Sequence, residues 1–554
     1  MRVALLTEGG YPYAQGESVA WCDRLLNGLP DHDFDVYALS RGRQQELGPR
    51  RTPPPAVRRV RTAPLWGPPA PGRVPRAAGR RFAECFAELT AALCPGYQPL
   101  GEDRTGRQAD RFASGLYGLA ALAAELGPPR PRPAGSLCAA GALSAWLYSE
   151  QALRVLESAC RAPGAPRAVQ AARLTDLLAV TERLERALRP LSLDWYGADA
   201  LGAARLCHAV GAGPAALPGL LARRFRGTPL LITEYGVRLR SHYLTSAAGP
   251  APGASAAGAA HAVAPSAAGA PVRALLGAFQ FRLAREAYAR AALITSGDAR
   301  ARRWQERCGA DPARLRTVYP GMDARPFAAV ARADAGRPAP ALVWVGRPGP
   351  DKDLAGLLHA FHAVRAAEPT ARLTVVATPA RGRPDDGYLA HCRALAARLF
   401  PGAPELVTFT EAGTAAVPTL ADAYAAGDVA VLSSAVEGFP VTLIEAMFCA
   451  RATVSTDAGA VCEVIGGTGL VVPPGDPRAL ADACLDLLRD PERRARLGAA
   501  ARARALELFT VERNVAAFRS VYHELSLGGP GEPPRPSWAR EPIRAGAGGR
   551  EERP

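Results

Sequence analysis

Two glutamates in the C-terminal half of the chain are the first residues whose spacing suggests chemistry. Glu437 and Glu445 lie eight residues apart in the segment 433–447, which reads SSAVEGFPVTLIEAM. The apolar residues before them predict a buried strand, and Pro440 suits the first turn of a helix after a short loop. Both carboxylates can then face the carboxyl edge of a parallel sheet and accept hydrogen bonds from sugar or ribose hydroxyls. The spacing fits equally well an acidic helix N-terminus followed by an ordinary exposed glutamate.

A glycine and two cations at a second strand–helix junction favour the first interpretation. The segment 343–354, VWVGRPGPDKDL, predicts a strand, a turn at Gly346 and Arg347, and Lys352 at the start of a helix. Two cations five residues apart, beside free backbone N–H groups, suit a diphosphate. Lys352 is the only lysine, whereas the other 66 of the 67 basic residues are arginines. Because an ammonium and a guanidinium are not interchangeable, this favours a binding role over two unrelated surface cations.

These motifs need a scaffold, and the rest of the chain predicts one of alternating strands and helices. Short apolar runs alternate with longer amphipathic stretches in both halves of the 554-residue chain. The expected strands are 2–7, 34–39, 205–210, 229–233, 292–296, 315–319, 341–345, 373–377, 407–410, 429–432, 452–455 and 469–472. Such alternation gives parallel, doubly wound sheets. Two such halves around a Pro/Ala linker predict an α/β protein with two Rossmann-like domains facing a cleft.

Changes in composition set the expected boundaries. We expect an N-terminal domain over 1–325, a C-terminal domain with a return helix over 326–525, and a disordered tail rich in Gly, Pro, Arg and Glu over 526–554. Residues 41–190 interrupt the first domain with a Pro/Arg-rich loop and then several Ala/Leu-rich stretches, which predict a helical insertion. Residues 246–270 are mostly Ala, Gly, Ser and Pro, which predicts a flexible loop.

The net charge of +15 is unevenly distributed. Residues 41–82 contain 11 arginines and nine prolines, with Glu46 as the one acidic residue. A basic segment of this kind supports the hypothesis of an adaptor that binds an anionic membrane or polymer. A solvated loop whose arginine content reflects codon bias explains the same residues. Nucleic acid is not an expected partner, because Trp66 is the only aromatic residue interleaved with these charges.

The remaining composition argues against several classes of protein. Hydrophobic residues make up 48% and charged residues 21%, as in globular proteins. The sequence contains no run of 18 apolar residues, which is about the length needed to span a membrane. The N-terminal sequence MRVALLTEGG reads as a buried strand rather than a secretory signal, so we expect a cytoplasmic protein. Eleven cysteines are scattered without C-x2-C spacing, and His359 and His362 lack neighbouring ligand residues. We therefore expect reduced thiols, and neither a metal nor another cofactor.

The motifs at 343–354 and 433–447 together resemble a known enzyme family. A strand followed by Gly-Arg-x4-Lys, and then Glu-x7-Glu, resembles the donor-site signature of the retaining, nucleotide-sugar-dependent glycosyltransferases of family 4, which have the GT-B fold. STDAGAVCEVI (455–465) and GLVVPPGDPRALADA (469–483) are also similar to the C-terminal half of that family. The resemblance is strongest over residues 290–525.

This resemblance implies a role for each matching residue. Gly346, Arg347 and Lys352 would hold the donor diphosphate, Glu437 would approach the transferred sugar as the catalytic residue, and Glu445 would contact the ribose. The donor implied is a nucleotide diphosphosugar, with a UDP-sugar expected, and the acceptor is a hydroxyl of a carbohydrate or glycoconjugate. No metal is implied, because the two cations and helix N-termini neutralise the leaving diphosphate.

The N-terminal half narrows the resemblance to one subgroup. Residues 8–21 (EGGYPYAQGESVAW), 207–240 and 296–323 are similar to the subgroup that includes PelF, a cytosolic glycosyltransferase of exopolysaccharide assembly. The resemblance implies that Gly16 lies in a glycine loop near the donor phosphate. It also implies an acceptor-side wall formed by His208, Glu234, Tyr235 and Arg240. A partner at the inner face of the cell membrane or in a polysaccharide-export complex would fit such a role.

Three departures from the subgroup keep a second hypothesis open. Glu17 follows Gly16 where the subgroup has Gly-Val, Tyr235 stands where it has histidine, and Pro320 stands where it has asparagine. The protein would then be a catalytically silent GT-B subunit that binds nucleotide or polymer in exopolysaccharide assembly. Hydrolysis of a nucleotide sugar by the purified protein would distinguish the enzyme from the silent subunit.

Overall fold

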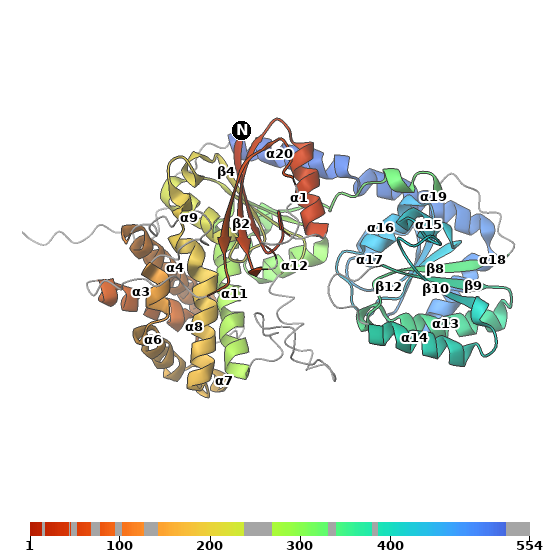
Figure 1. The fold of residues 1–554 in the computed structure, drawn as a ribbon, viewed down its shortest axis with the longest axis horizontal. Coiled ribbons are helices and arrows are strands. Elements are labelled where there is room, and N and C mark those ends of the chain that lie inside the picture. Colours follow the sequence, from red (N-terminus) through yellow and green to blue (C-terminus); the bar gives the residue numbers. More distant parts are fainter. Residues whose placement is uncertain are drawn as a thin grey trace, which may run out of the picture.

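Two parallel β-sheets organise the chain (Figure 1). The computed structural model describes residues 1–13, 17–43, 45, 52–67, 78–94, 102–126, 142–237, 269–330, 339–378 and 386–527. The first sheet has the strand order β3-β2-β1-β4-β5-β6-β7, and the second has the order β10-β9-β8-β11-β12-β13. The recorded strand ladders are all parallel, and in each sheet the order reverses beside the first strand, β1 or β8. Two doubly wound sheets of this kind confirm the predicted α/β fold class.

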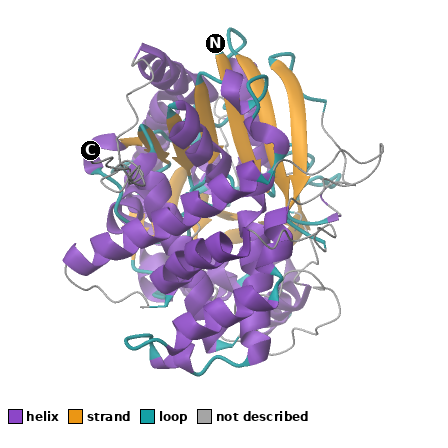
Figure 2. Cartoon of the chain, turned by 90° about the vertical axis from the view of Figure 1, so that its left-hand side faces the viewer, coloured by secondary structure: helices purple, strands orange, loops and turns teal. Residues whose placement is uncertain are grey.

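The N-terminal sheet is built from short apolar strands covered by helices. Its strands are β1 (Arg2–Glu8), β2 (Asp33–Ser40), β3 (Val57–Pro64), β4 (Leu206–Val210), β5 (Leu230–Glu234), β6 (Leu293–Ser296) and β7 (Leu315–Thr317). The helices beside it include α1 (Glu17–Gly28), α9 (Ala216–Arg226), α11 (Ala270–Arg290) and α12 (Ala299–Arg307). Residues 3–7 of β1 are all buried, as expected for a parallel strand with helices packed against it (Figure 2).

Strand β3 corrects one expectation, since it lies within the segment expected to be a Pro/Arg-rich loop. Its sequence VRRVRTAP carries three arginines, and it pairs with β2 at the end of the sheet, where charged side chains are tolerated. Beneath it Asp35 is 1% exposed. The Asp35 carboxylate accepts a hydrogen bond from Arg2 Nε at 2.6 Å and one from Arg59 Nε at 3.1 Å. Two strand arginines, Arg2 of β1 and Arg59 of β3, therefore neutralise a buried carboxylate, a pairing that local hydrophobic patterning does not reveal.

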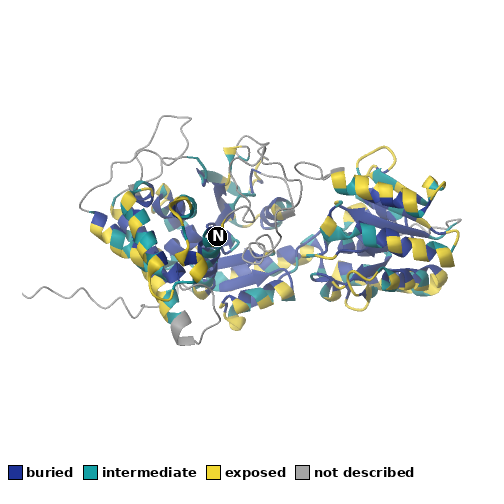
Figure 3. Cartoon of the chain, turned by 90° about the horizontal axis from the view of Figure 1, so that it is seen from below, coloured by how far each residue is buried: buried dark blue, intermediate teal, exposed yellow. Residues whose placement is uncertain are grey.

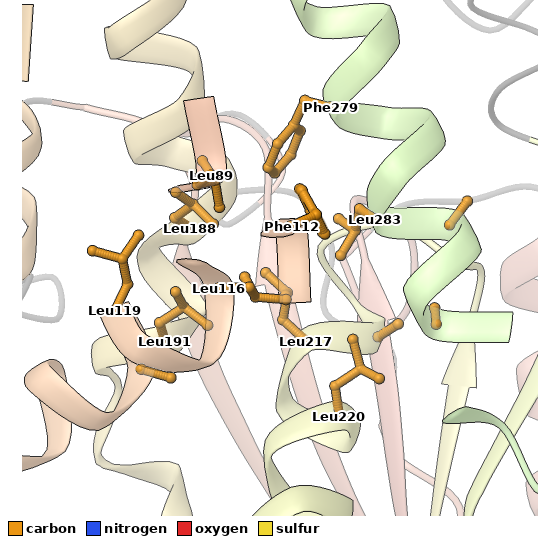
Figure 4. Close-up of a cluster of buried hydrophobic side chains, with 14 of the residues drawn as sticks. Leu89, Phe112, Leu116, Leu119, Leu188, Leu191, Leu217, Leu220, Phe279 and Leu283 are labelled. Atoms are coloured by element: carbon orange, nitrogen blue, oxygen red, sulfur yellow. The ribbon is translucent and has the colours of Figure 1, made fainter. Parts of the chain in front are cut away.

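The helical insertion between β3 and β4 is confirmed. Its principal helices are α3 (Gly79–Leu93), α4 (Glu102–Glu125), α5 (Ala142–Leu147), α6 (Glu150–Arg161) and α8 (Leu174–Leu188). Apolar side chains of this insertion meet those of α9 and α11 in one core (Figure 4). The labelled members are Leu89, Phe112, Leu116, Leu119, Leu188, Leu191, Leu217, Leu220, Phe279 and Leu283. The insertion thus packs on helices that flank the N-terminal sheet rather than standing apart from it.

The C-terminal sheet has its own core. Its strands are β8 (Ala341–Gly346), β9 (Arg372–Ala377), β10 (Val407–Glu411), β11 (Val429–Leu432), β12 (Ala452–Thr456) and β13 (Leu470–Val472). The helices are α13 (Leu354–Ala367), α14 (Asp386–Leu399), α15 (Leu420–Ala425), α16 (Val441–Phe448), α17 (Val461–Ile465), α18 (Pro477–Arg489) and α19 (Pro491–Leu508). The strands are buried between helices whose outer faces are exposed (Figure 3).

The last described helix, α20 (Val511–Leu527), returns to the N-terminal sheet and packs against α1 (Figure 1). The chain crosses between the halves at Met322, whose N–H donates to Phe509 O at 2.8 Å and whose carbonyl accepts from Val511 N–H at 3.2 Å. On α20, Phe518 and Tyr522 are fully buried. Among the described helices, none has the length and hydrophobicity needed to cross a bilayer.

Candidate active site

The two predicted donor motifs meet because their strands are neighbours. Strand β8 ends at Gly346 and β11 ends at Leu432, and the two strands pair in parallel at the point where the sheet order reverses. Ligands bind in such doubly wound folds outside the carboxyl ends of the strands at this position. A cation that follows β8 and a carboxylate that follows β11 are therefore placed at one edge. The structure confirms that the two motifs share this edge.

Lys352 and Glu437 make a direct ion pair at this edge. Lys352 Nζ lies 2.5 Å from Glu437 Oε2, and their side chains are 18% and 10% exposed, respectively. The Ser434 hydroxyl donates to the same carboxylate oxygen at 3.0 Å. The ammonium and the carboxylate thus neutralise each other in this structure. A bound diphosphate would have to compete with Glu437 for Lys352.

Backbone contacts join the two loops that carry this pair. The N–H groups of Ala435 and Val436 donate to Asp351 O at 2.9 and 3.1 Å, and the Ser433 hydroxyl donates to Lys352 O at 2.8 Å. Directly after Lys352, the side chain of Asp353 accepts from Gly356 N–H at 3.0 Å and caps α13. The start of this helix therefore lies beside the cation, an arrangement that suits anion binding.

Gly346 and Arg347 lie at the same edge, but they differ in exposure. Gly346 is buried at the end of β8, and a Cβ added to it would lie 3.3 Å from the Trp344 ring. The Arg347 side chain is 62% exposed, and its recorded ion pair is with Asp351 at 3.9 Å. At that distance the contact is too long for a hydrogen bond, so the guanidinium can reorient toward an anion at little cost.

Glu445 is a nearly buried carboxylate rather than an ordinary exposed one. It lies on α16 with 9% of its surface exposed, and its Oε2 accepts a hydrogen bond from the Tyr424 hydroxyl at 2.8 Å. Burial and the neighbouring Glu445 carboxylate raise the pKa of Tyr424 well above its ordinary value. The same hydroxyl also lies 2.9 Å from Thr442 O, so its single hydrogen is shared between the two acceptors. The structure thus excludes the surface-residue interpretation of Glu445.

A third loop, which follows β12, packs against the Glu437 loop. Its individual residues were not predicted as part of the site. Gly459 has a positive φ of +62°, and a Cβ added there would lie 2.4 Å from Gly438 O. The Thr456 hydroxyl donates to Ser434 O at 2.6 Å. In the sequence, the only signal for this close approach to Gly438 was the presence of a glycine, Gly459, shortly after the predicted strand 452–455.

His208 corrects the expected acceptor-side wall. It is fully buried on β4, with Nδ1 2.7 Å from the Tyr522 hydroxyl and Nε2 2.7 Å from Thr233 Oγ1. Burial lowers its pKa to about 3, so the ring is neutral at ordinary pH. Both ring nitrogens are engaged within the protein, and His208 presents neither to an acceptor in this structure. Its position inside the sheet, beneath α20, is the physical reason.

Glu234 and Tyr235 also direct their polar atoms into the protein. Glu234 is 4% exposed, and its carboxylate accepts hydrogen bonds from the Tyr288 hydroxyl and, at 3.5 Å, from Gln305 Nε2. The Tyr235 hydroxyl accepts a hydrogen bond from Asn514 Nδ2 of α20 at 3.1 Å. Burial raises the pKa of Tyr235, so its hydroxyl stays neutral. Tyr235 therefore contacts the return helix, where a residue of the acceptor wall was expected.

Two predicted site residues, Gly16 and Arg240, lie outside the described residues. The same holds for residues 246–268 of the loop expected at 246–270, and for residues 528–554 of the tail expected at 526–554. Within the described ranges, no group of three or more His, Cys, Asp or Glu side chains is arranged to hold a metal ion. The cysteines found there are free thiols.

Two family models match the chain. Residues 1–115 and 138–313 match a domain of unknown function, DUF3492, and together they make up more than half of the chain. Residues 339–490 match the family described as glycosyl transferases group 1. The second match includes both motifs of the donor edge.

The curated relatives match part of the chain. It is 36% identical over 232 residues to the D-inositol 3-phosphate glycosyltransferase of Kineococcus radiotolerans, which covers 38% of this chain and 52% of the relative. It is 33% identical over 108 residues to the N-acetyl-alpha-D-glucosaminyl L-malate synthase of Bacillus anthracis, which covers 19% and 28%. The chain thus spans about half or less of these relatives' length.

Solved structures resemble the whole arrangement. HepE of Anabaena in complex with UDP matches with a TM-score of 0.53 and 14% identity over 95% of this chain and 100% of that one. Sucrose-phosphate synthase of Thermosynechococcus elongatus matches with a TM-score of 0.51 and 17% identity, over 95% and 98%. At these identities the likeness shows the fold alone, and it confirms the predicted GT-B arrangement.

Proposed function

The chain belongs to the DUF3492 family and carries a glycosyl transferases group 1 domain, and from this premise we propose that it is a glycosyltransferase. It would move a sugar from a nucleotide diphosphosugar to a hydroxyl acceptor with retention at the anomeric carbon. The observation that carries the proposal is the pairing of Lys352 with Glu437 at the switch point between β8 and β11. A cation for the diphosphate and a carboxylate for the sugar are needed side by side there.

In the proposed reaction, charge develops in two places. The bond between the anomeric carbon and the diphosphate oxygen breaks, and negative charge grows on the leaving group. Lys352, Arg347 and the start of α13 would stabilise that charge electrostatically, so the proposal needs no metal. The acceptor oxygen bonds to the anomeric carbon on the same face, and its proton passes to the leaving phosphate. Glu437, released from Lys352, would stabilise the positive charge near the anomeric carbon.

Glu445 would bind the donor rather than take part in bond breaking. Its buried carboxylate accepts a hydrogen bond from the Tyr424 hydroxyl, and ribose hydroxyls are donors of the kind that a carboxylate accepts. We propose a UDP-sugar as the donor, supported by HepE of the same fold, which is described in complex with UDP. The acceptor would be a carbohydrate or glycoconjugate, and the resemblance to the PelF subgroup favours exopolysaccharide assembly, with a peripheral partner at the cell membrane.

Two alternatives are separable from this proposal. A catalytically silent subunit is supported by one observation, namely that His208 and Tyr235, two of the expected acceptor-side residues, engage their polar atoms within the protein. The basic-segment adaptor is disfavoured, because several of its arginines already pair with carboxylates. These pairs are Arg41–Glu8, Arg59–Asp35, Arg61–Asp199, Arg80–Glu84 and Arg81–Glu125.

The proposal is tested by binding and turnover together. Thermal shift with UDP, GDP, ADP and their sugars identifies the donor, because a ligand that binds only the folded state raises the melting temperature. Release of free nucleotide from the stabilising donor, with and without acceptors, then measures turnover. Stabilisation together with nucleotide release supports the transferase. Stabilisation without release from any donor supports the silent subunit.

A further inference from the structure

One carboxylate of the C-terminal half contacts the N-terminal half close to the Glu437 loop. Glu463 lies on α17, and its Oε2 accepts a hydrogen bond from the backbone N–H of Ala299 at 2.8 Å. Its Oε1 accepts a hydrogen bond from the Tyr319 hydroxyl at 2.9 Å. Ala299 begins α12, and Tyr319 follows β7, the last strand of the N-terminal sheet. A single side chain thus joins the two halves through both of its oxygens.

The contact with Ala299 is electrostatically favourable. The first N–H groups of a helix have no acceptor within the helix and form the positive end of its dipole. In α12, Asp298 accepts from Ala301 N–H at 2.7 Å, and Glu463 accepts from Ala299 N–H. The start of α12 therefore receives one carboxylate from each half of the chain. Burial and the hydrogen bond to Glu463 raise the pKa of Tyr319 to about 12, so Tyr319 remains a donor.

On the donor side, Glu463 is held rigidly to the Glu437 loop. Just before α17, the Ala460 N–H donates to Gly438 O at 3.0 Å, and the close approach of Gly459 fixes the same carbonyl. On the opposite side, Arg504 of α19 donates to the carbonyls of Val464 and Glu463, each at 2.8 Å. The Glu437 loop and the start of α17 are therefore in direct contact.

On the N-terminal side, α12 is held against the expected acceptor edge. It follows β6, whose last residue, Ser296, is in register with Glu234 of β5. Between β6 and α12, Gly297 packs so closely that a Cβ there would lie 2.6 Å from Tyr235 Cδ1. The start of α12 therefore packs directly beside the end of β5.

We propose that Glu463 is a positioning residue that couples the Glu437 loop to this edge of the N-terminal sheet. Its two hydrogen bonds hold the donor site of one half in register with the acceptor side of the other. The identification of the two sites as a donor site and an acceptor side rests on the proposed function. The observed contact of Glu463 with Ala299 and Tyr319 does not depend on it. Glu463 acts through Ala299 and Tyr319 rather than through a substrate.

The first test uses hydrogen exchange on the ligand-free full chain, comparing Glu463→Ala with Asp490→Ala. Asp490 is the matched control because its carboxylate accepts from Arg493 N–H at 2.8 Å and caps α19 within one half. We expect amides in the first turn of α12 to exchange about tenfold or more faster in Glu463→Ala, as expected for loss of a hydrogen bond to a charged acceptor. They should be unchanged in Asp490→Ala. If the α12 amides of Glu463→Ala exchanged at the same rate as in the wild type, the proposal would be overturned.

The second test is kinetic and distinguishes positioning from donor binding. Glu463→Ala should lower kcat by about tenfold or more while the Kd for UDP stays within about twofold, the pattern of an interaction used in the transition state. Glu463→Gln keeps an acceptor for Ala299 and should recover part of the loss. A parallel loss of UDP affinity would overturn the coupling role. If wild type binds UDP but transfers no sugar, the proposed function fails, and the exchange comparison alone decides whether Glu463 joins the halves.

Discussion

The imidazole Nδ1 of His208 lies 2.7 Å from the hydroxyl oxygen of Tyr522, although 314 residues separate them in the chain. The polar contacts continue from His208 Nε2 to Thr233 Oγ1 at 2.7 Å and on to Thr295 Oγ1 at 2.6 Å. These residues lie on α20, β4, β5 and β6, so a buried hydrogen-bonded chain crosses the N-terminal sheet. Removing any one member would leave its neighbours buried without a full set of partners, at about 1–3 kcal/mol each.

The buried His208 predicts that stability depends on pH. The pKa of His208 is lowered to about 3 in the folded state, whereas in the unfolded chain its pKa is about 6.5. Below about pH 6.5 the unfolded state therefore binds more protons, and the free energy of unfolding falls as pH decreases toward 3. This one group should contribute a slope of about 1.4 kcal/mol per pH unit. Urea unfolding from pH 7.5 to 4.5 should show a shallower dependence for His208→Gln than for wild type. The same dependence in His208→Gln and in the exposed-residue control His391→Gln would contradict this.

The donor cations should both be needed for nucleotide binding. Lys352→Ala and Arg347→Ala should each weaken UDP binding by about 1.5–3 kcal/mol, the size of a hydrogen bond to a charged group. Isothermal titration measures this, with the exposed Arg398→Ala as control. Unchanged affinity in both site variants would refute the assignment of this edge to the diphosphate.

Glu437→Gln should separate binding from turnover. In the ligand-free structure the carboxylate holds the Lys352 ammonium, so removing its charge frees the cation for the diphosphate. UDP affinity should then stay equal or increase, while turnover falls by about 100-fold because transition-state charge is no longer stabilised. Titration and initial rates measure the two effects. A loss of UDP affinity as large as that in Lys352→Ala would be inconsistent with this role.

Glu445→Gln should have the opposite profile. Contacts with the ribose persist in the ground state and the transition state alike, so donor affinity should fall while kcat at saturation changes little. Tyr424→Phe is the matched variant, because it removes the hydrogen bond to Glu445 and keeps the carboxylate. It should reduce affinity less than Glu445→Gln. Steady-state kinetics with varied donor distinguish them, and a pure kcat defect in Glu445→Gln would exclude ribose binding.

Gly459→Ala should displace the Glu437 loop. The new Cβ would lie 2.4 Å from Gly438 O, and the positive φ of this position disfavours alanine. We expect turnover to fall while the melting temperature decreases by only a few degrees, since the strain is about 1–2 kcal/mol and local. Gly475→Ala is the control, because Gly475 also has a positive φ but has open space around its Cβ. Equal activity in the two variants would show that the loop tolerates the shift.

Most strands could be predicted from the sequence because they are short apolar runs buried on both faces. β3 is the exception, since Arg59 is satisfied by Asp35 on the neighbouring strand and no local pattern reports that partner. The donor edge was predictable for a related reason. Gly346 ends β8, whereas Lys352 and Glu437 lie in the short loops after β8 and β11. Adjacent parallel strands bring such loops together.

The acceptor side was less predictable because its surroundings are set by distant residues. His208 lies within a predicted strand, 205–210, and Tyr522 covers it from the far end of the chain. In the same way, the Tyr235 hydroxyl bonds to Asn514. Spacing along the sequence gives the order of the strands, but it does not report which side of a strand end a returning helix will cover.

Helix α20 also has a consequence for synthesis of the protein. The core of the N-terminal sheet includes Phe518 and Tyr522, which pack against residues from the first forty of the chain. On the ribosome, which makes proteins from the N-terminus, the part of this core that α20 supplies is missing until nearly all of the C-terminal half has emerged. A nascent chain stopped before Val511 would expose Trp21 and His208 to water. Chaperones should bind it, and proteases should degrade it, more readily than the full chain.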